Sequence, residues 1–111
     1  MSKRNSDVFI DDIHRAIQRI NSFKQGLESE EDLRSDELRQ SAIVKQLEII
    51  GEAASNVDDG VQSRHSAVPW QDLKDFRNVT THQYWEIDVT IVWDVIENKI
   101  PELQDNLPRQ E

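Results

Sequence analysis

The sequence of 111 residues contains no cysteine, only three glycines and only three prolines. The lack of cysteine excludes disulfide bonds and thiolate metal sites, and it agrees with a reducing compartment. With so few turn and linker signals, the length predicts a single domain over residues 1–111. Residues 1–12 (MSKRNSDVFIDD) lack the apolar run of a secretion signal, and no segment reaches the roughly 20 apolar residues of a membrane span. We therefore expect a cytoplasmic protein without membrane contact.

Basic residues are also scarce, because 13 Lys and Arg stand against 22 Asp and Glu and the net charge is −9. Such a charge disfavours general affinity for nucleic acids, which are polyanions. The acidity is uneven along the chain. Residues 60–85 hold three basic and two acidic side chains, so this stretch carries +1 and the other 85 residues carry −10. A nucleic acid would be tolerated at this stretch and repelled by most of the remaining surface.

Helical periodicity is present along nearly the whole chain, with apolar residues three and four positions apart. The first such segment has Ser6 as its expected N-cap and Gly26 near its end. The acidic stretch 28–36 has room for one helical turn. The second long segment, 35–56, contains Gly51 in mid-pattern; glycine costs a helix about 1 kcal/mol relative to alanine, so we expect a second backbone close by. The apolar stripes are Phe9, Ile13, Ala16, Ile17, Ile20, Phe23 and Leu27 in the first segment, and Leu38, Ala42, Ile43, Leu47, Ile50, Ala54 and Val57 in the second.

Two further helices are expected after a loop at 56–68. Pro69 suits the first turn of a helix that extends to about His82, and Asp88 is the expected N-cap of the last helix. Pro101 lacks an N–H, so a kink or a break is predicted just before it. The expected core residues of these helices are Trp70, Leu73 and Phe76, then Val89, Val92, Trp93, Ile96, Ile100 and Leu103.

The expected fold class follows from these segments, since no stretch alternates in the manner of a strand. We predict an all-α fold, an antiparallel bundle of four to five helices. The helices are rather apolar for so small a bundle, and three tryptophans lie within residues 70–93. A second copy of the chain would cover part of this surface, and homodimers are the commonest assembly.

The segment RNVTTHQYW, residues 77–85, gathers Arg77, Asn78, His82 and Tyr84. One interpretation is a polar helix end at which the charged side chains offset the helix dipole. The other interpretation is a functional site. Asn78 and His82 are four positions apart and share a helix face, whereas Arg77 and His82 are separated by about 140° and about 7.5 Å on an ideal helix. Spacing alone therefore does not build a closed site within one chain, although a cleft between two protomers would relax that constraint.

The residue types in this segment suit RNA cleavage. Histidine titrates near neutral pH and is the usual general acid or base, and arginine binds a phosphate through its planar fork. Attack of an RNA 2′-hydroxyl on its own adjacent phosphate needs proton transfers and such an anion clamp. His14 and His65 have no matched ligands nearby in the sequence, so neither a metal site nor a cofactor is expected.

The pattern R-x-x-x-x-H-x-Y, formed by Arg77, His82 and Tyr84, resembles the HepT-like toxin ribonuclease family of the HEPN superfamily. The resemblance covers essentially the whole chain, because further segments look like that family in the same order. These segments are LEIIGEAA (47–54), PW (69–70) and YWEIDVTIVWDVIENKIPEL (84–103). The resemblance implies an all-helical homodimer whose two motifs line a cleft at the interface. It also implies a metal-independent endoribonuclease acting on tRNA or mRNA, the toxin of a type VII-like pair with a nucleotidyltransferase antitoxin.

Residue roles follow from the same resemblance. Arg77 would bind and polarise the scissile phosphate, and His82 would be the general acid or base with Asn78 in support. Tyr84 would accept AMP groups from the nucleotidyltransferase, and the added phosphates would repel RNA through like charge and bulk.

Several neighbouring positions bear on these roles. Val79 stands where family members often carry a basic residue, and Gln83 stands where glycine is common, so weaker RNA affinity and less access to the tyrosine are expected. Gly51 and Glu52 match the family pattern; Glu52 either faces solvent or an interface, or it reaches the cleft. Trp85 could stack a base, as in readers of single-stranded RNA, whereas Trp70 and Trp93 are expected in the core.

A non-catalytic binding module is the alternative to the ribonuclease. Such a helical partner would carry nucleotide or substrate for a separate nucleotidyltransferase. Arg77 would still bind phosphate, but His82 would only donate a hydrogen bond. The charge of −9 favours this alternative slightly, and catalysis on RNA separates the two.

Overall fold

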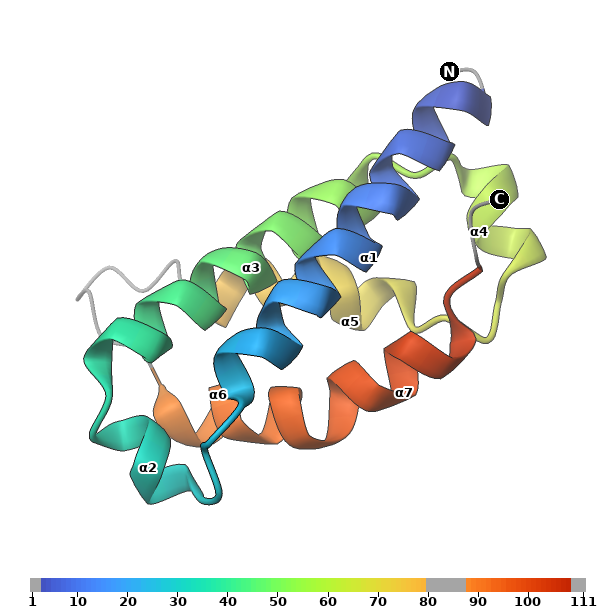
Figure 1. The fold of residues 1–111 in the computed structure, drawn as a ribbon. Helices are drawn as coiled ribbons and strands as arrows, with labels where there is room; N and C mark the ends of the chain where they lie inside the picture. Colours follow the sequence, from blue (N-terminus) through green and yellow to red (C-terminus); the bar gives the residue numbers. More distant parts are fainter. Residues whose placement is uncertain (1–2, 80–87, 109–111) are drawn as a thin grey trace.

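The computed structural model describes residues 3–79 and 88–108, and the regular structure in these ranges is entirely helical. Successive long elements run in alternating directions (Figure 1), which confirms the predicted antiparallel bundle. Short helices α2 (Glu30–Arg34) and α4 (Asp59–Arg64) lie in the connections. The long elements are α1 (Lys3–Lys24), α3 (Glu37–Ser55), α5 (Trp70–Asp75) with the 3-10 turn η1 (Phe76–Val79), and a final stretch of α6 (Val89–Asp94), the π turn η2 (Val95–Lys99) and α7 (Ile100–Asn106). Within the described ranges, no helix has the length and apolar character needed to cross a bilayer.

The N-terminal end of α1 differs from the prediction, because Ser6 lies inside the helix and is not its N-cap. Ser6 is fully buried, and its Oγ accepts a hydrogen bond of 3.0 Å from the backbone N–H of Asp58. A serine hydroxyl bonds readily to any nearby backbone group, and here that group comes from 52 residues further along the chain. The other end is as predicted: Gly26 follows α1 with φ +89°, a left-handed angle that glycine adopts without a steric cost.

Side-chain caps begin the next two helices. The acidic stretch forms the single turn α2, as predicted, and the Ser29 Oγ accepts the Asp32 N–H at 3.2 Å. The α3 helix begins after Asp36, whose Oδ1 accepts the Arg39 N–H at 3.0 Å. Each cap satisfies a backbone donor that the first helical turn leaves without a partner.

The loop expected at 56–68 is a correction, because it contains the helix α4. A helix of six residues is too short for its periodicity to be recognised. Val61 is buried, and the Trp70 indole N–H donates to the carbonyls of Gln62 and His65, each at 3.1 Å. The tertiary contact with Trp70 thus stabilises the end of α4.

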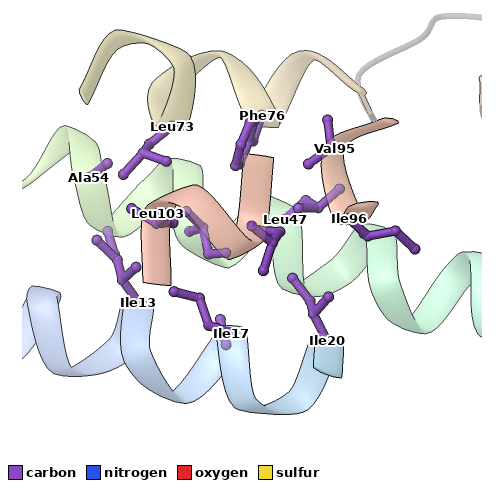
Figure 2. Packing of buried hydrophobic residues seen from close by; sticks show 14 of the residues in the cluster. Ile13, Ile17, Ile20, Leu47, Ala54, Leu73, Phe76, Val95, Ile96 and Leu103 are labelled. Carbon is purple, nitrogen blue, oxygen red and sulfur yellow. The ribbon is translucent and has the colours of Figure 1, made fainter. Parts of the chain in front are cut away.

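Apolar side chains from all the long elements meet in one core, and most of the predicted core residues belong to it. Leu38 is an exception with 81% of its surface exposed, because it lies in the first turn of α3. Periodicity indicates which face of a helix is apolar, but not where neighbouring elements stop covering that face. Figure 2 shows part of the core, with Ile13, Ile17 and Ile20 of α1, Leu47 and Ala54 of α3, Leu73 of α5, Phe76 of η1, Val95 and Ile96 of η2, and Leu103 of α7.

The final helical stretch begins as predicted but does not break. The Asp88 Oδ1 accepts the Ile91 N–H at 3.2 Å, which confirms the N-cap. Ile100, directly before Pro101, keeps the helical angles φ −65° and ψ −45°, so the predicted break is wrong. The helix continues through Pro101 to Asn106.

The irregularity caused by the proline is the π turn η2 directly before it. In η2 the Ile100 N–H donates to the carbonyl of Val95. The Ile96 carbonyl thereby loses its α-helical donor, and its π-helical donor would be Pro101, which has no N–H. Lys24 of α1 replaces them, because its Nζ lies 3.4 Å from the Ile96 oxygen.

Candidate functional site

Arg77 lies on η1, the 3-10 turn that continues from α5. Its backbone is anchored from both sides of the turn, since Leu73 and Phe76 are buried in the core. The Arg77 side chain itself is 48% exposed. The structure thus presents a guanidinium at the surface on a firmly packed backbone.

Gly51 of α3 lies directly against Arg77. A Cβ built on Gly51 would lie 2.3 Å from the Arg77 Cγ, 3.1 Å from the Arg77 backbone N and 3.1 Å from the Leu73 carbonyl oxygen. The predicted close approach of a second backbone is therefore confirmed. The absence of a side chain at Gly51 lets the α5–η1 segment pack closely on α3 and leaves room for the first part of the Arg77 side chain.

Glu52 follows Gly51 and contacts the far end of the same arginine. The Arg77 Nη1 donates to the Glu52 Oε1 at 3.3 Å, and the Glu52 side chain is 68% exposed. The other carboxylate oxygen, Oε2, lies 3.5 Å from the Asn56 Nδ2, which also donates to the Glu52 carbonyl at 2.8 Å. Glu52 is thus both exposed to solvent and paired with the motif arginine.

Asn56 was not singled out by the sequence analysis. The available signal was its spacing of four from Glu52 at the end of a helix, which places the two side chains on one face. The contact between Glu52 and Arg77 had no such signal, since these residues are 25 positions apart and belong to different helices.

The remaining motif residues are not brought into this description. His82, Gln83, Tyr84 and Trp85 lie outside the described residues, and so does the side chain of Asn78. The approach of Arg77 to His82 and a cleft shared by two protomers therefore stay predictions.

The other residues considered at the sequence level have structural surroundings. Trp70 is buried, and Trp93 is partly buried and packs against the core, which confirms both as core residues. The His14 Nε2 lies 2.7 Å from the Pro108 carbonyl oxygen, and His65 follows α4 as its C-cap. Within residues 3–79 and 88–108, no three His, Asp or Glu side chains converge as metal ligands would.

The chemical capacity of the described part of the site is anion binding. A guanidinium offers five N–H donors in a planar fork that matches two oxygens of a phosphate. Arg77 holds this group at the surface, beside one carboxylate at 3.3 Å. Binding of a phosphate there would place two anionic groups around one cation.

Comparisons with known proteins agree with the resemblance. The family model described as "Ribonuclease HepT-like" matches residues 13–109. The chain is 32% identical over 102 residues to the "Probable ribonuclease HepT" of Thermococcus cleftensis, covering 92% of each chain. It is 32% identical over 101 residues to a candidate RNase of Methanocaldococcus jannaschii, covering 91% of this chain and 83% of the relative. A candidate RNase of Caldanaerobacter subterraneus is 38% identical over 74 residues, covering 67% and 66% respectively. No solved structure gives a significant match.

Proposed function

Because this chain belongs to the HepT-like ribonuclease family, we propose that it is a metal-independent endoribonuclease that cleaves tRNA or mRNA. The observation that carries the proposal is the family match over residues 13–109, which includes the whole segment 77–85. The half-exposed guanidinium of Arg77 supports it, since cleavage needs a cation at the scissile phosphate.

The proposed reaction is attack of a 2′-hydroxyl oxygen on the adjacent phosphorus. The new bond joins that oxygen to phosphorus, and the bond from phosphorus to the 5′-oxygen breaks. Arg77 offsets the charge that develops on the phosphate oxygens. His82, with Asn78 in support, takes the proton from the 2′-hydroxyl or gives a proton to the leaving 5′-oxygen.

The biological setting that we propose is a type VII-like toxin–antitoxin pair in the cytoplasm. Two copies of the chain would form a homodimer with both motifs in one cleft. A nucleotidyltransferase antitoxin would adenylylate Tyr84, and the added negative charge would exclude RNA from the cleft.

A second candidate function is a non-catalytic binding module that assists the nucleotidyltransferase. The net charge of −9 and the carboxylate of Glu52 beside Arg77 favour it, because both oppose a polyanionic substrate. In this role Arg77 binds phosphate, and no bond in RNA is broken.

RNA cleavage in EDTA tests the proposal, with purified protein whose mass verifies that it is unmodified. We expect cleavage by the parent protein and its loss in Arg77→Ala and His82→Ala, while far-UV circular dichroism stays unchanged. Matched controls are Arg64→Ala and His65→Ala, which remove the same residue types from α4 and its C-cap. Full cleavage by either motif variant would refute the assigned roles. If no protein in the series cuts RNA, the binding module becomes the better function.

A further inference from the structure

We infer that Glu52 is a positioning residue that aims the guanidinium of Arg77, with Gly51 and Asn56 completing the device. The inference rests on the proposed function, in which Arg77 contacts the scissile phosphate. It adds a residue of α3, 25 positions before Arg77, to the machinery of cleavage.

The Arg77 side chain is constrained near both of its ends. At its beginning, the Cγ occupies space that a side chain on residue 51 would fill, since a Cβ there would lie 2.3 Å away. At its end, the Nη1 donates to the Glu52 Oε1 at 3.3 Å. Neighbouring residues of one helix, Gly51 and Glu52, thus define where the side chain starts and where its charge is held.

The carboxylate of Glu52 is itself held in place. Its Oε2 lies 3.5 Å from the Asn56 Nδ2, and this amide is fixed by a shorter bond of 2.8 Å to the Glu52 carbonyl. Asn56 is the C-cap of α3, so the last turn of the helix supports the carboxylate. The chain of contacts therefore runs from Asn56 through Glu52 to Arg77.

An exposed ion pair of this kind adds little to stability, because water screens it and two long side chains lose conformational freedom. Its main effect is to restrict the rotamers of a half-exposed arginine, which favours the transition state if the aim is correct. The same carboxylate repels the incoming phosphate, so it weakens RNA binding. Glu52 therefore raises kcat and does not lower KM.

Steady-state cleavage kinetics with Glu52→Ala test this split. We expect kcat to fall about tenfold, the range of a modest misorientation of a catalytic group, while KM stays equal or decreases. Asn56→Ala should lower kcat in the same direction but less. The matched control is Glu48→Ala, which removes the same charge one turn earlier on α3, where Glu48 lies 3.8 Å from Lys45. An unchanged kcat in Glu52→Ala, or a raised KM with kcat unchanged, would overturn the inference.

A second measurement keeps this inference separate from the proposed function. The heteronuclear NOE of the Arg77 Nε–Hε signal in ¹⁵N-labelled protein, assigned by its absence in Arg77→Ala, reports side-chain order without RNA. We expect the NOE to decrease in Glu52→Ala and to be unchanged in Glu48→Ala. If the parent protein does not cleave RNA, the ribonuclease proposal fails and the NOE still decides whether Glu52 orders Arg77. An equal NOE in Glu52→Ala and the parent protein would refute positioning, whatever the kinetics.

Discussion

Replacing Gly51 by alanine tests the close packing that underlies the site. On helix propensity alone, Gly51→Ala in the interior of α3 would stabilise the protein by about 1 kcal/mol. The added Cβ would however lie 3.1 Å from two backbone atoms, the Leu73 oxygen and the Arg77 nitrogen, as well as 2.3 Å from the Arg77 Cγ. The side chain can swing away, but the two backbone atoms can yield only if α5 and η1 shift.

The size of the effect follows from setting these opposing contributions side by side. Forcing an extra methyl group into a packed interface costs about 1–3 kcal/mol, which exceeds the gain of about 1 kcal/mol in helix propensity. We therefore expect Gly51→Ala to lower the free energy of unfolding by about 1 kcal/mol, which for a chain of this length lowers Tm by about 4 °C.

Urea denaturation followed by circular dichroism measures this free energy. The matched control is Gly60→Ala in α4, where the nearest heavy atom to the new Cβ is the Arg64 Nη1 at 4.0 Å. This control should stabilise the protein by about 0.5–1 kcal/mol. In the Arg77→Ala background the cost of Gly51→Ala should decrease, since the contact at 2.3 Å is removed. Equal stabilisation by Gly51→Ala and Gly60→Ala would refute the close approach.

Two further predictions concern stability and use the same urea assay. Lys24→Met should cost about 1–3 kcal/mol, because the Ile96 carbonyl loses its donor, whereas Glu97→Gln, which weakens only the exposed ion pair with Lys24, should cost less than about 1 kcal/mol; equal costs would contradict the assignment. Leu38→Gln should change stability by less than about 0.5 kcal/mol, whereas Leu47→Ala in the core should cost about 2–5 kcal/mol. A large cost for Leu38→Gln would show that its first-turn position is covered in solution.

Local chemistry made much of the fold predictable. Asp88 as an N-cap and Gly51 as a point of close approach follow from rules that involve a few adjacent residues. The role of Ser6 and the pairing of Glu52 with Arg77 do not, because each depends on which faces of distant helices meet. Periodicity identifies the apolar face of a helix but says nothing of the rotation that places one polar side chain opposite another.

Pro101 shows the same limit in a different way. The local rule correctly states that proline removes an N–H from the helix. The rule does not predict how the chain compensates, and here the compensation consists of a π turn and the ammonium of Lys24 from another helix. Only the packing of α1 against η2 makes that donor available.

The π turn η2 also bears on the insertions and deletions that the chain can accept. Loss of one residue from this turn would restore a regular helix, but it would rotate all that follows by about 100° and draw it back by about 1.5 Å. Leu103 and Leu107, both buried, would then leave the core, and the Pro108 carbonyl would move away from His14. The spacing between Asp88 and Leu107 is thus constrained in length as well as in composition, and homologues that lack one residue in η2 are expected to carry a compensating insertion before Leu103.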